Sequence, residues 1–211
     1  MRLVILGVGG HGRVVAETAR VAGLDLLGFI DEDRALHTAT PLGLPVLGST
    51  TAVEHRQIDC DGVLLGVGRN SVRIALLRRF LVTGHALPAL IHPRAWVSPN
   101  SFLGPGTVVM ANATVQTGCR LGAAVIINTN ASIDHDGVLA DGVHISPGAH
   151  LAGNVAVGEG THIGIGATVI EGIRIGAGCL VAAGAVVIRD VLDGQRVAGV
   201  PARPMRSQER V

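Results

Sequence analysis

Residues 103–139 read LGPGTVVMANATVQTGCRLGAAVIINTNASIDHDGVL, with an aliphatic residue at every sixth position. The same step runs without interruption from Ile91 to Val187, and each position on it holds Ile, Leu or Val. Three residues after each step the chain has mainly Gly, Asn or Asp, the residue types that tolerate a left-handed corner. Four residues after each step the side chain is mostly small, as at Ala113 and Cys119.

This period predicts a parallel β-helix made of hexapeptides, with three hexapeptides in each triangular coil. A β-sandwich would instead show alternation with a period of two and irregular turns. Because the register never slips between residues 91 and 187, we expect no inserted loop. Residues 18 apart are expected to stack on neighbouring coils at the ~4.8 Å spacing of β-strands.

The first part of the chain has a different pattern. Three short apolar segments, 2–7, 24–31 and 62–68, read as strands, and two segments, 11–23 and 71–84, have helical spacing. Alternating strands and helices predict a small parallel sheet. We therefore expect two domains: residues 1–88 form a Rossmann-like α/β half domain, and residues 89–211 form the β-helix with a C-terminal tail.

Composition excludes several classes of function. All 17 basic residues are Arg, so the chain has no lysine for a Schiff base or a Walker-type phosphate loop. A net charge of +1 and 2% aromatic residues argue against nucleic-acid binding. The three widely spaced cysteines are typical of free thiols in a reducing compartment. With no secretory signal and no membrane span expected, the sequence predicts a cytoplasmic protein that does not bind membranes.

A glycine motif lies at the junction of the first expected strand and helix. Gly7 to Gly12 satisfy G-x-G-x-x-G, and Asp31 follows about 20 residues later at the end of the next strand. Amides at a helix N-terminus favour a pyrophosphate. Since about 85 residues leave no room for a second mononucleotide half, a nucleotide diphosphate fits better than NAD. The alternative is that the glycines only pack the helix onto the strand.

The sequence Asp134-His135-Asp136 stands out within the repeats. A carboxylate that accepts a hydrogen bond from one ring nitrogen fixes the tautomer and raises the basicity of the other nitrogen. Gly153 is 18 residues from His135, which leaves open space beside the ring and an amide that could meet an oxyanion. His135 is therefore a candidate general base.

Two further histidines, His144 and His162, are also 18 residues apart and should stack. Stacked imidazoles could bind a metal, but no carboxylate shares their column, so we expect no metal. A surface ladder, or one histidine that contacts a ligand, is the alternative. Cys119 and Cys179 occupy inward small positions, which argues against a nucleophilic role.

The whole set of motifs resembles bacterial sugar acetyltransferases, the group of sialic acid O-acetyltransferases and bacillosamine and perosamine N-acetyltransferases. The resemblance covers nearly the entire chain. It is carried by GVGGHGRVV, FIDED, GVGRN, the hexapeptides, the segment INTNASIDHDGVLADGVHISPGAHLAGNVAVGEG and the closing AGVPARPMR. It implies a left-handed β-helix that assembles as a homotrimer, with acetyl-CoA between neighbouring prisms and a nucleotide-sugar site on the N-terminal domain.

The resemblance also implies roles for individual residues. His135 would be the general base and Asp136 its orienting acid, although many relatives have Glu at the latter position. Gly153, Asn128 and His144 match positions near the acetyl group or the acceptor, and Arg203 could meet a CoA phosphate. The nucleotide-sugar side would be formed by Gly9, Gly10, His11, Asp31, Gly68, Arg69 and Asn70.

The implied reaction is direct transfer of acetyl from acetyl-CoA to the amine of a UDP- or GDP-linked 4-amino-deoxysugar, in polysaccharide biosynthesis. A sialic acid O-acetyltransferase is the alternative within this class. Two readings come from other classes: a zinc β-helix enzyme like the γ-class carbonic anhydrases, and a non-catalytic scaffold that binds nucleotide sugars. The sequence leaves the sugar and the nucleotide base open.

Overall fold

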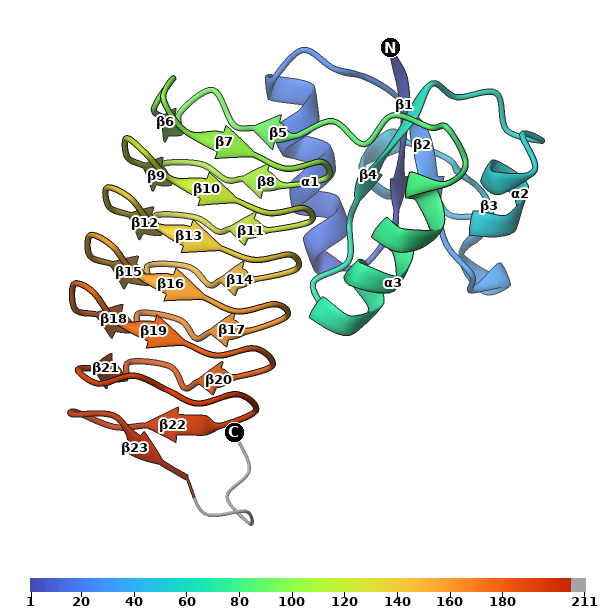
Figure 1. The fold of residues 1–211 in the computed structure, drawn as a ribbon. Helices are drawn as coiled ribbons and strands as arrows, with labels where there is room; N and C mark the ends of the chain where they lie inside the picture. The colour runs from blue at the N-terminus through green and yellow to red at the C-terminus, as the bar shows by residue number, and fades with distance from the viewer. Residues whose placement is uncertain (206–211) are drawn as a thin grey trace.

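A computed structural model describes residues 1–205 of the chain. Its N-terminal part contains a four-stranded parallel sheet in the order β3-β2-β1-β4 (Figure 1). The strands are β1 (Arg2–Leu6), β2 (Asp25–Ile30), β3 (Val46–Gly48) and β4 (Gly62–Leu65). The helices are α1 (Gly10–Val21), α2 (Thr50–Glu54) and α3 (Asn70–Leu81), with short 3-10 turns η1 (Arg34–Leu36) and η2 (Pro41–Gly43).

Local sequence explains the limits of the two long helices. Helix α1 follows Gly9 directly, and Gly23 just beyond its end adopts φ +75°, a conformation that glycine enters at little cost. Helix α3 begins at Asn70 after Arg69, one residue earlier than the expected segment. The weakly patterned stretch between β2 and β4 also contains β3 and α2, which the sequence did not predict.

From Leu90 onward the chain winds as a triangular β-helix with three parallel sheets. The five-stranded sheet contains β7 (Phe102–Leu103), β10 (Arg120–Leu121), β13 (Val138–Leu139), β16 (Ala156–Val157) and β19 (Arg174–Ile175). The six-stranded sheet contains β6 (Trp96–Val97), β9 (Thr114–Val115), β12 (Ser132–Ile133), β15 (His150–Leu151), β18 (Thr168–Val169) and β21 (Val186–Val187). The eight-stranded sheet contains β5 (Leu90–Ile91), β8 (Val108–Val109), β11 (Ile126–Ile127), β14 (His144–Ile145), β17 (His162–Ile163), β20 (Leu180–Val181), β22 (Arg196–Ala198) and the antiparallel β23 (Arg203–Pro204).

The repeat positions behave as the six-residue period predicts. Every aliphatic step from Val109 to Val187 is at most 3% exposed. Every corner position from Gly106 to Gly184 has a positive φ, between 53° and 76°. The three steps of the first coil are less buried: Ile91 is 39% exposed, and Val97 and Leu103 are partly buried, because this coil is covered on one side only.

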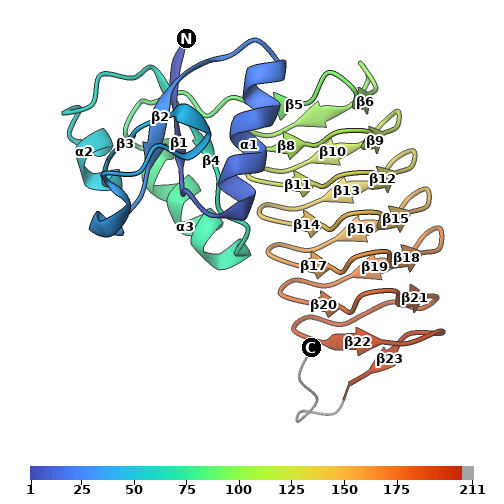
Figure 2. The same cartoon turned by 180° about the vertical axis from the view of Figure 1, so that it is seen from behind.

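The N-terminal part packs against the eight-stranded sheet, with α1 between the two sheets (Figures 1 and 2). Val15 of α1 belongs to the same apolar cluster as Val108 and Ile126 of the β-helix. Helix α3 buries Leu77 and Phe80 in a second cluster that includes the corner residue Ala124. The N-terminal glycine loop is thereby held beside the middle coils.

No helix within residues 1–205 is both long enough and apolar enough to cross a membrane.

Candidate functional site

His135 lies at the corner where the chain passes from β12 to β13. Its backbone N–H donates to Asp134 Oδ1 at 2.7 Å, and its ring Nδ1–H donates to Asp136 Oδ2 at 2.9 Å. The hydrogen bond to Asp136 raises the pKa of His135 above its ordinary value, with desolvation opposing it and the charges of Asp134 and Asp136 adding to it. The side chain is 52% exposed, and with Nδ1 donating to Asp136 the other ring nitrogen, Nε2, is left as the acceptor.

Asp136 is held at the corner by the coil before it. Its backbone has φ +60°, and its N–H donates to Thr117 O at 3.0 Å. The carboxylate lies over Gly118, where a Cβ would collide with Oδ1. Glycine at 118 thus makes room for the carboxylate that orients His135.

Gly153 lies on the other side of the imidazole, one coil later. A Cβ at this position would come within 2.5 Å of both Cε1 and Nε2 of His135. The expected stacking of a histidine on a glycine is therefore present. The glycine leaves the reactive edge of the ring unobstructed by a side chain.

A second polar group lies on the eight-stranded sheet. His144 and His162 pair on β14 and β17 with ring centroids 4.6 Å apart, and His11 approaches His144 to 6.5 Å. Asn128 Nδ2 donates to His144 Nε2 at 3.2 Å. Ser146, which the sequence reading did not single out, lies with Oγ 2.8 Å from His162 Nε2.

These histidines are held in their neutral form. Burial lowers the pKa of His11 to about 4, with help from the charge of Arg73. Burial, His162, Arg73 and His11 together lower the pKa of His144 to about 3. His11 Nε2 and His144 Nδ1 are buried and have no hydrogen-bond partner among residues 1–205. Both ring nitrogens lie inside the packed cluster, shielded from solvent by their neighbours.

The glycine motif divides into two parts with different surroundings. A Cβ at Gly12 would overlap the carbonyl oxygen of Gly7, so this glycine packs helix α1 onto β1. A Cβ at Gly9 or Gly10 would meet no atom of residues 1–205 within 4 Å, and both glycines are exposed at the start of α1. The packing alternative accounts for Gly12, while Gly9 and Gly10 leave the helix N-terminus open to an anion.

Asp31 orders the loop next to this helix. Its Oδ2 accepts from Val8 N–H and its Oδ1 from Asp33 N–H, both at 3.0 Å. It also lines a cleft of about 360 Å³ at the carboxyl ends of β1, β2 and β4. In open parallel sheets this edge is where ligands bind.

Glu32 lines the same cleft and accepts hydrogen bonds from both the N–H and the hydroxyl of Thr50. The sequence pattern predicts no site role for either residue, because it does not predict the short helix α2 that begins at Thr50.

The GVGRN loop enters the same region from β4. A Cβ added at Gly68 would lie 3.8 Å from the Cβ of His11. Arg69 is exposed. Asn70 points into the β-helix instead, where its Nδ2 donates to Gly160 O at 2.9 Å. Arg73 was missed by the sequence reading, although its spacing from Leu77 and Phe80 places it on the buried stripe of α3.

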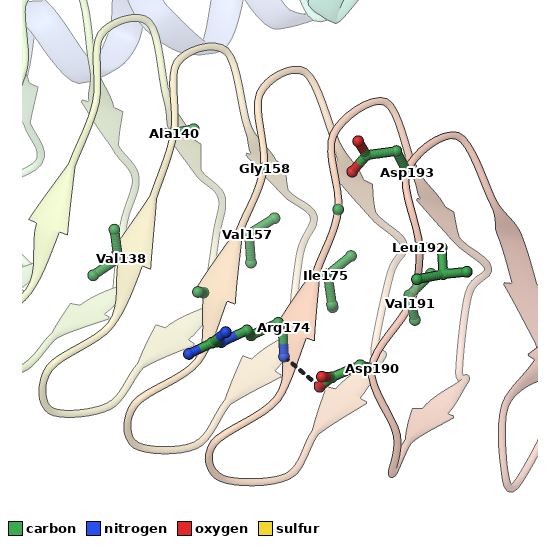
Figure 3. A pocket seen from close by; sticks show the side chains of 12 residues that line it. Val138, Ala140, Val157, Gly158, Arg174, Ile175, Asp190, Val191, Leu192 and Asp193 are labelled. Atoms are coloured by element: carbon green, nitrogen blue, oxygen red, sulfur yellow. Dashed lines mark hydrogen bonds between the residues drawn. The ribbon is translucent and has the colours of Figure 1, made fainter.

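A groove of about 700 Å³ runs along the five-stranded sheet (Figure 3). Its wall begins at Val138, three residues after His135, and continues through Ile175 to Asp190. Arg174 lies along it, and the backbone N–H of Arg174 donates to Asp190 Oδ1 at 2.8 Å (Figure 3). Arg203 is exposed in a smaller hollow of about 290 Å³ at the C-terminal end of the prism.

The site residues form two groups within one chain. His135, Asp136 and Gly153 share the corner between the six-stranded and five-stranded sheets. His11, Gly68, Asn128 and His144 gather at the eight-stranded sheet beside the N-terminal part. Among residues 1–205, no three His, Cys, Asp or Glu side chains lie close enough together to hold a metal ion.

Comparison with known proteins places the chain among sugar acetyltransferases. Residues 2–80 match the PglD N-terminal domain. A UDP-N-acetylbacillosamine N-acetyltransferase of Bacillus subtilis (strain 168) is 39% identical over 117 residues, or 52% of this chain. The match spans only about half of that relative's length, 51%.

Solved structures match over nearly the full length. The acetyltransferase domain of PglB from Neisseria gonorrhoeae FA1090 is 41% identical with a TM-score of 0.91, over 97% of this chain and 99% of that domain. A variant of perosamine N-acetyltransferase from Caulobacter crescentus, in complex with CoA and GDP-perosamine, is 38% identical with a TM-score of 0.94, over 98% of both chains. The predicted fold class, an α/β domain followed by a left-handed parallel β-helix, is confirmed.

Proposed function

This chain belongs to the family of bacterial sugar N-acetyltransferases that contains perosamine N-acetyltransferase and the PglB acetyltransferase domain, and we propose that it acetylates the amine of a nucleotide-linked amino sugar with acetyl-CoA. The favoured acceptor is a UDP- or GDP-linked 4-amino-deoxysugar. The contact between His135 and Asp136 carries the mechanistic part of the proposal, because it supplies a base in reach of solvent.

The proposed reaction is a direct transfer. The neutral amine attacks the thioester carbonyl carbon, and His135 Nε2 takes the proton that the nitrogen loses as the C–N bond forms. The carbonyl becomes tetrahedral, and its oxyanion accepts a hydrogen bond from the N–H of Gly153. Collapse of this intermediate breaks the C–S bond and releases CoA. Asp136 keeps the ring in the tautomer that accepts at Nε2 throughout.

The acceptor is proposed to bind through its nucleotide at the N-terminal part. The open helix start at Gly9 and Gly10 would hold the diphosphate, and the cleft beside Asp31 would hold the nucleoside. His11 and the exposed Arg69 lie on the same side.

Acetyl-CoA is proposed to lie along the groove of the five-stranded sheet. The groove has an apolar wall suited to a pantetheine chain, and it starts three residues from His135. Arg203 lies near the C-terminal end of the prism, where it could meet a phosphate of CoA. His135 and Asp136 do not line the groove themselves, so the thioester would project beyond its end at Val138.

The separation of the site residues into two groups on different faces of the prism supports a homotrimer. His135 and His144 lie on different faces of one prism, so one chain does not offer both to the same acetyl group. A second copy packed beside the first would bring its His144 group, with Asn128, to the corner that holds His135. Closed cyclic assembly of three prisms makes three equivalent sites. A cytoplasmic location fits the three free cysteines.

Purified protein incubated with acetyl-CoA and each of UDP- and GDP-linked 4-amino sugars should release CoA and yield an acetamido product by mass spectrometry. His135→Ala should reduce kcat by roughly 100-fold or more, the usual contribution of a general base. Product acetylated on a hydroxyl would support the O-acetyltransferase alternative. Binding of a nucleotide sugar without any binding of acetyl-CoA would support a scaffold and contradict the proposal.

A further inference from the structure

Arg73 is a buried cation without an acidic partner among the described residues 1–205. Its side chain is 1% exposed, and burial lowers its pKa to about 10, so it keeps its charge at neutral pH. All five N–H donors of the guanidinium are used by neutral oxygens. Nε donates to Ala124 O (2.8 Å), Nη1 to Val67 O (3.1 Å) and Gly68 O (2.8 Å), and Nη2 to Asn70 Oδ1 (3.0 Å) and Gly142 O (2.9 Å). Removing a charge from water costs free energy of desolvation, and hydrogen bonds from all five N–H groups offset part of that cost.

These bonds join the loop after β4 to the β-helix. Ala124 and Gly142 are corner residues of neighbouring coils, and their positive φ angles belong to the regular turn of the prism. Asn70, itself bound to Arg73, donates to Gly160 O on the next coil. The loop of residues 67–70 is therefore fixed to three consecutive coils through one guanidinium and one amide.

The fixed loop lies between the two halves of the proposed acceptor site. Gly68 faces the Cβ of His11 at the start of α1, and His144 follows Gly142 by two residues. The guanidinium thus sets the separation between the open helix N-terminus and the imidazole on β14. A shift of the loop would move the bound nucleotide relative to the β-helix without moving the groove on the five-stranded sheet.

Arg73 also acts on the nearby imidazoles through its charge. After burial, its charge helps to lower the pKa of His11 from α1 and of His162 from β17, and it contributes at His144 together with both of those rings. Neutral rings can both donate and accept hydrogen bonds.

We propose that Arg73 is a positioning residue that locks loop 67–70 onto the β-helix and so fixes the nucleotide end of the acceptor at the distance from which its amine reaches the acetyl group. This inference rests on the proposed function for its kinetic consequences. The lock itself follows from the five hydrogen bonds.

The test compares Arg73→Lys with Ile74→Ala. Lysine keeps a charge but cannot span five acceptors. Ile74, the neighbouring residue, packs against Gly142 at the same interface and makes none of these hydrogen bonds, so its truncation loosens the contact without releasing the loop. We expect Arg73→Lys to raise the KM for the nucleotide sugar about tenfold or more while the KM for acetyl-CoA changes less than about twofold. Ile74→Ala should leave the ratio of the two KM values unchanged.

Two further measurements keep the inference testable if Arg73→Lys does not fold. Asn70→Ala retains the guanidinium and removes one of its acceptors, and it should give the same selective rise in KM at smaller amplitude. Calorimetry with UDP and GDP measures the nucleotide Kd of each variant without turnover. The Kd of the nucleotide that binds should rise in parallel with the KM for the nucleotide sugar.

Equal changes in both KM values, or the same pattern in Ile74→Ala, would overturn the positioning role. An unchanged chain that binds UDP or GDP but transfers no acetyl group would refute the proposed function, and the calorimetric comparison would still decide the role of Arg73. A chain that binds neither nucleotide would refute both.

Discussion

The imidazole of His135 lies so close to Gly153, 18 residues later, that a Cβ on the glycine would come within 2.5 Å of Cε1 and Nε2. The contact joins two consecutive coils at one corner of the prism. It is a direct consequence of the repeat, because Asn154 N–H also donates to His135 O at 2.9 Å in the same stacking. The reactive edge of the ring thus lies against a backbone with no side chain.

Gly153→Ala is expected to displace the imidazole and lower kcat by about tenfold or more, with little loss of stability because the ring is exposed and can move. Steady-state kinetics and urea unfolding measure the two effects. The matched control is the double variant His135→Ala with Gly153→Ala, which should be no slower than His135→Ala alone. A further additive loss would show that the alanine acts by another route.

Asp136→Asn should move the acid limb of the rate profile to lower pH. The hydrogen bond from His135 to Asp136 raises the pKa of the imidazole, so the unchanged protein loses its neutral base at a pH above the ordinary value of about 6.5. Asparagine tolerates the φ of +60° at this corner, which keeps the backbone in place. The profile of kcat/KM against pH measures the shift. The value of kcat should also fall, because asparagine no longer holds the His135 ring in the tautomer that accepts at Nε2.

Asp134→Asn is the comparison for this variant. Asp134 binds the backbone N–H of His135 rather than its ring, and it acts on the ring only through its charge. Its replacement should shift the acid limb less. Equal shifts in the two variants would argue against a special role for Asp136.

The buried histidines should make the protein less stable in acid. The pKa values of His11 and His144, about 4 and about 3, lie below those of the unfolded chain, so the unfolded state binds more protons below pH ~6.5. The free energy of unfolding should therefore fall as pH drops from about 6.5 toward 4, by up to ~1.4 kcal/mol per pH unit for each histidine. Urea unfolding of the unchanged protein and of His144→Gln across this range checks it, and the variant should show a shallower slope.

Gly142→Ala should destabilise the contact between α3 and the β-helix. A Cβ there would collide with Ile74, and the φ of +65° adds strain. Gly148 has the same φ and open space around it, so Gly148→Ala measures the strain alone. We expect Gly142→Ala to cost about 1–3 kcal/mol more than Gly148→Ala in urea unfolding, the usual range for overpacking. Adding Ile74→Ala to Gly142→Ala should recover part of the difference.

Mixing two inactive variants tests the shared site. If His135 and His144 act together across a subunit contact, His135→Ala and His144→Gln subunits refolded together should regain about a quarter of the activity per site, as random cyclic assembly predicts. Each variant refolded alone provides the baseline. A mixture no more active than that baseline would place both histidines in the same chain's site or exclude one of them.

The corner positions show how far a local pattern reaches. Asn112 and Asp136 adopt the left-handed backbone because every hexapeptide repeats the same turn. The residue types of a single hexapeptide are enough to indicate that turn. The stacking of His144 on His162 follows from the same count of 18. Such features are predictable because each depends on a neighbour at a fixed distance along the chain.

Other features depend on contacts that no period encodes. Asn70 was expected on the nucleotide side, yet its amide donates to Gly160, 90 residues away. Arg73 lies on the buried stripe of α3 by its spacing, but no pattern shows that its guanidinium is paired with the carbonyls of Ala124 and Gly142, 51 and 69 residues away. Asp31 was predicted from a motif, but its two hydrogen bonds to the chain around it came only with the folded loop.

The sequence by itself determined the three-sided prism, its core and the presence of an acid-flanked histidine beside a glycine, because these are repeated local requirements of one turn. Only the tertiary structure decided which face of the prism meets the N-terminal sheet, since that choice depends on apolar surface and hydrogen bonds from distant segments. That docking put His11 beside His144, buried Arg73 between them and the loop, and left His135 on a different corner.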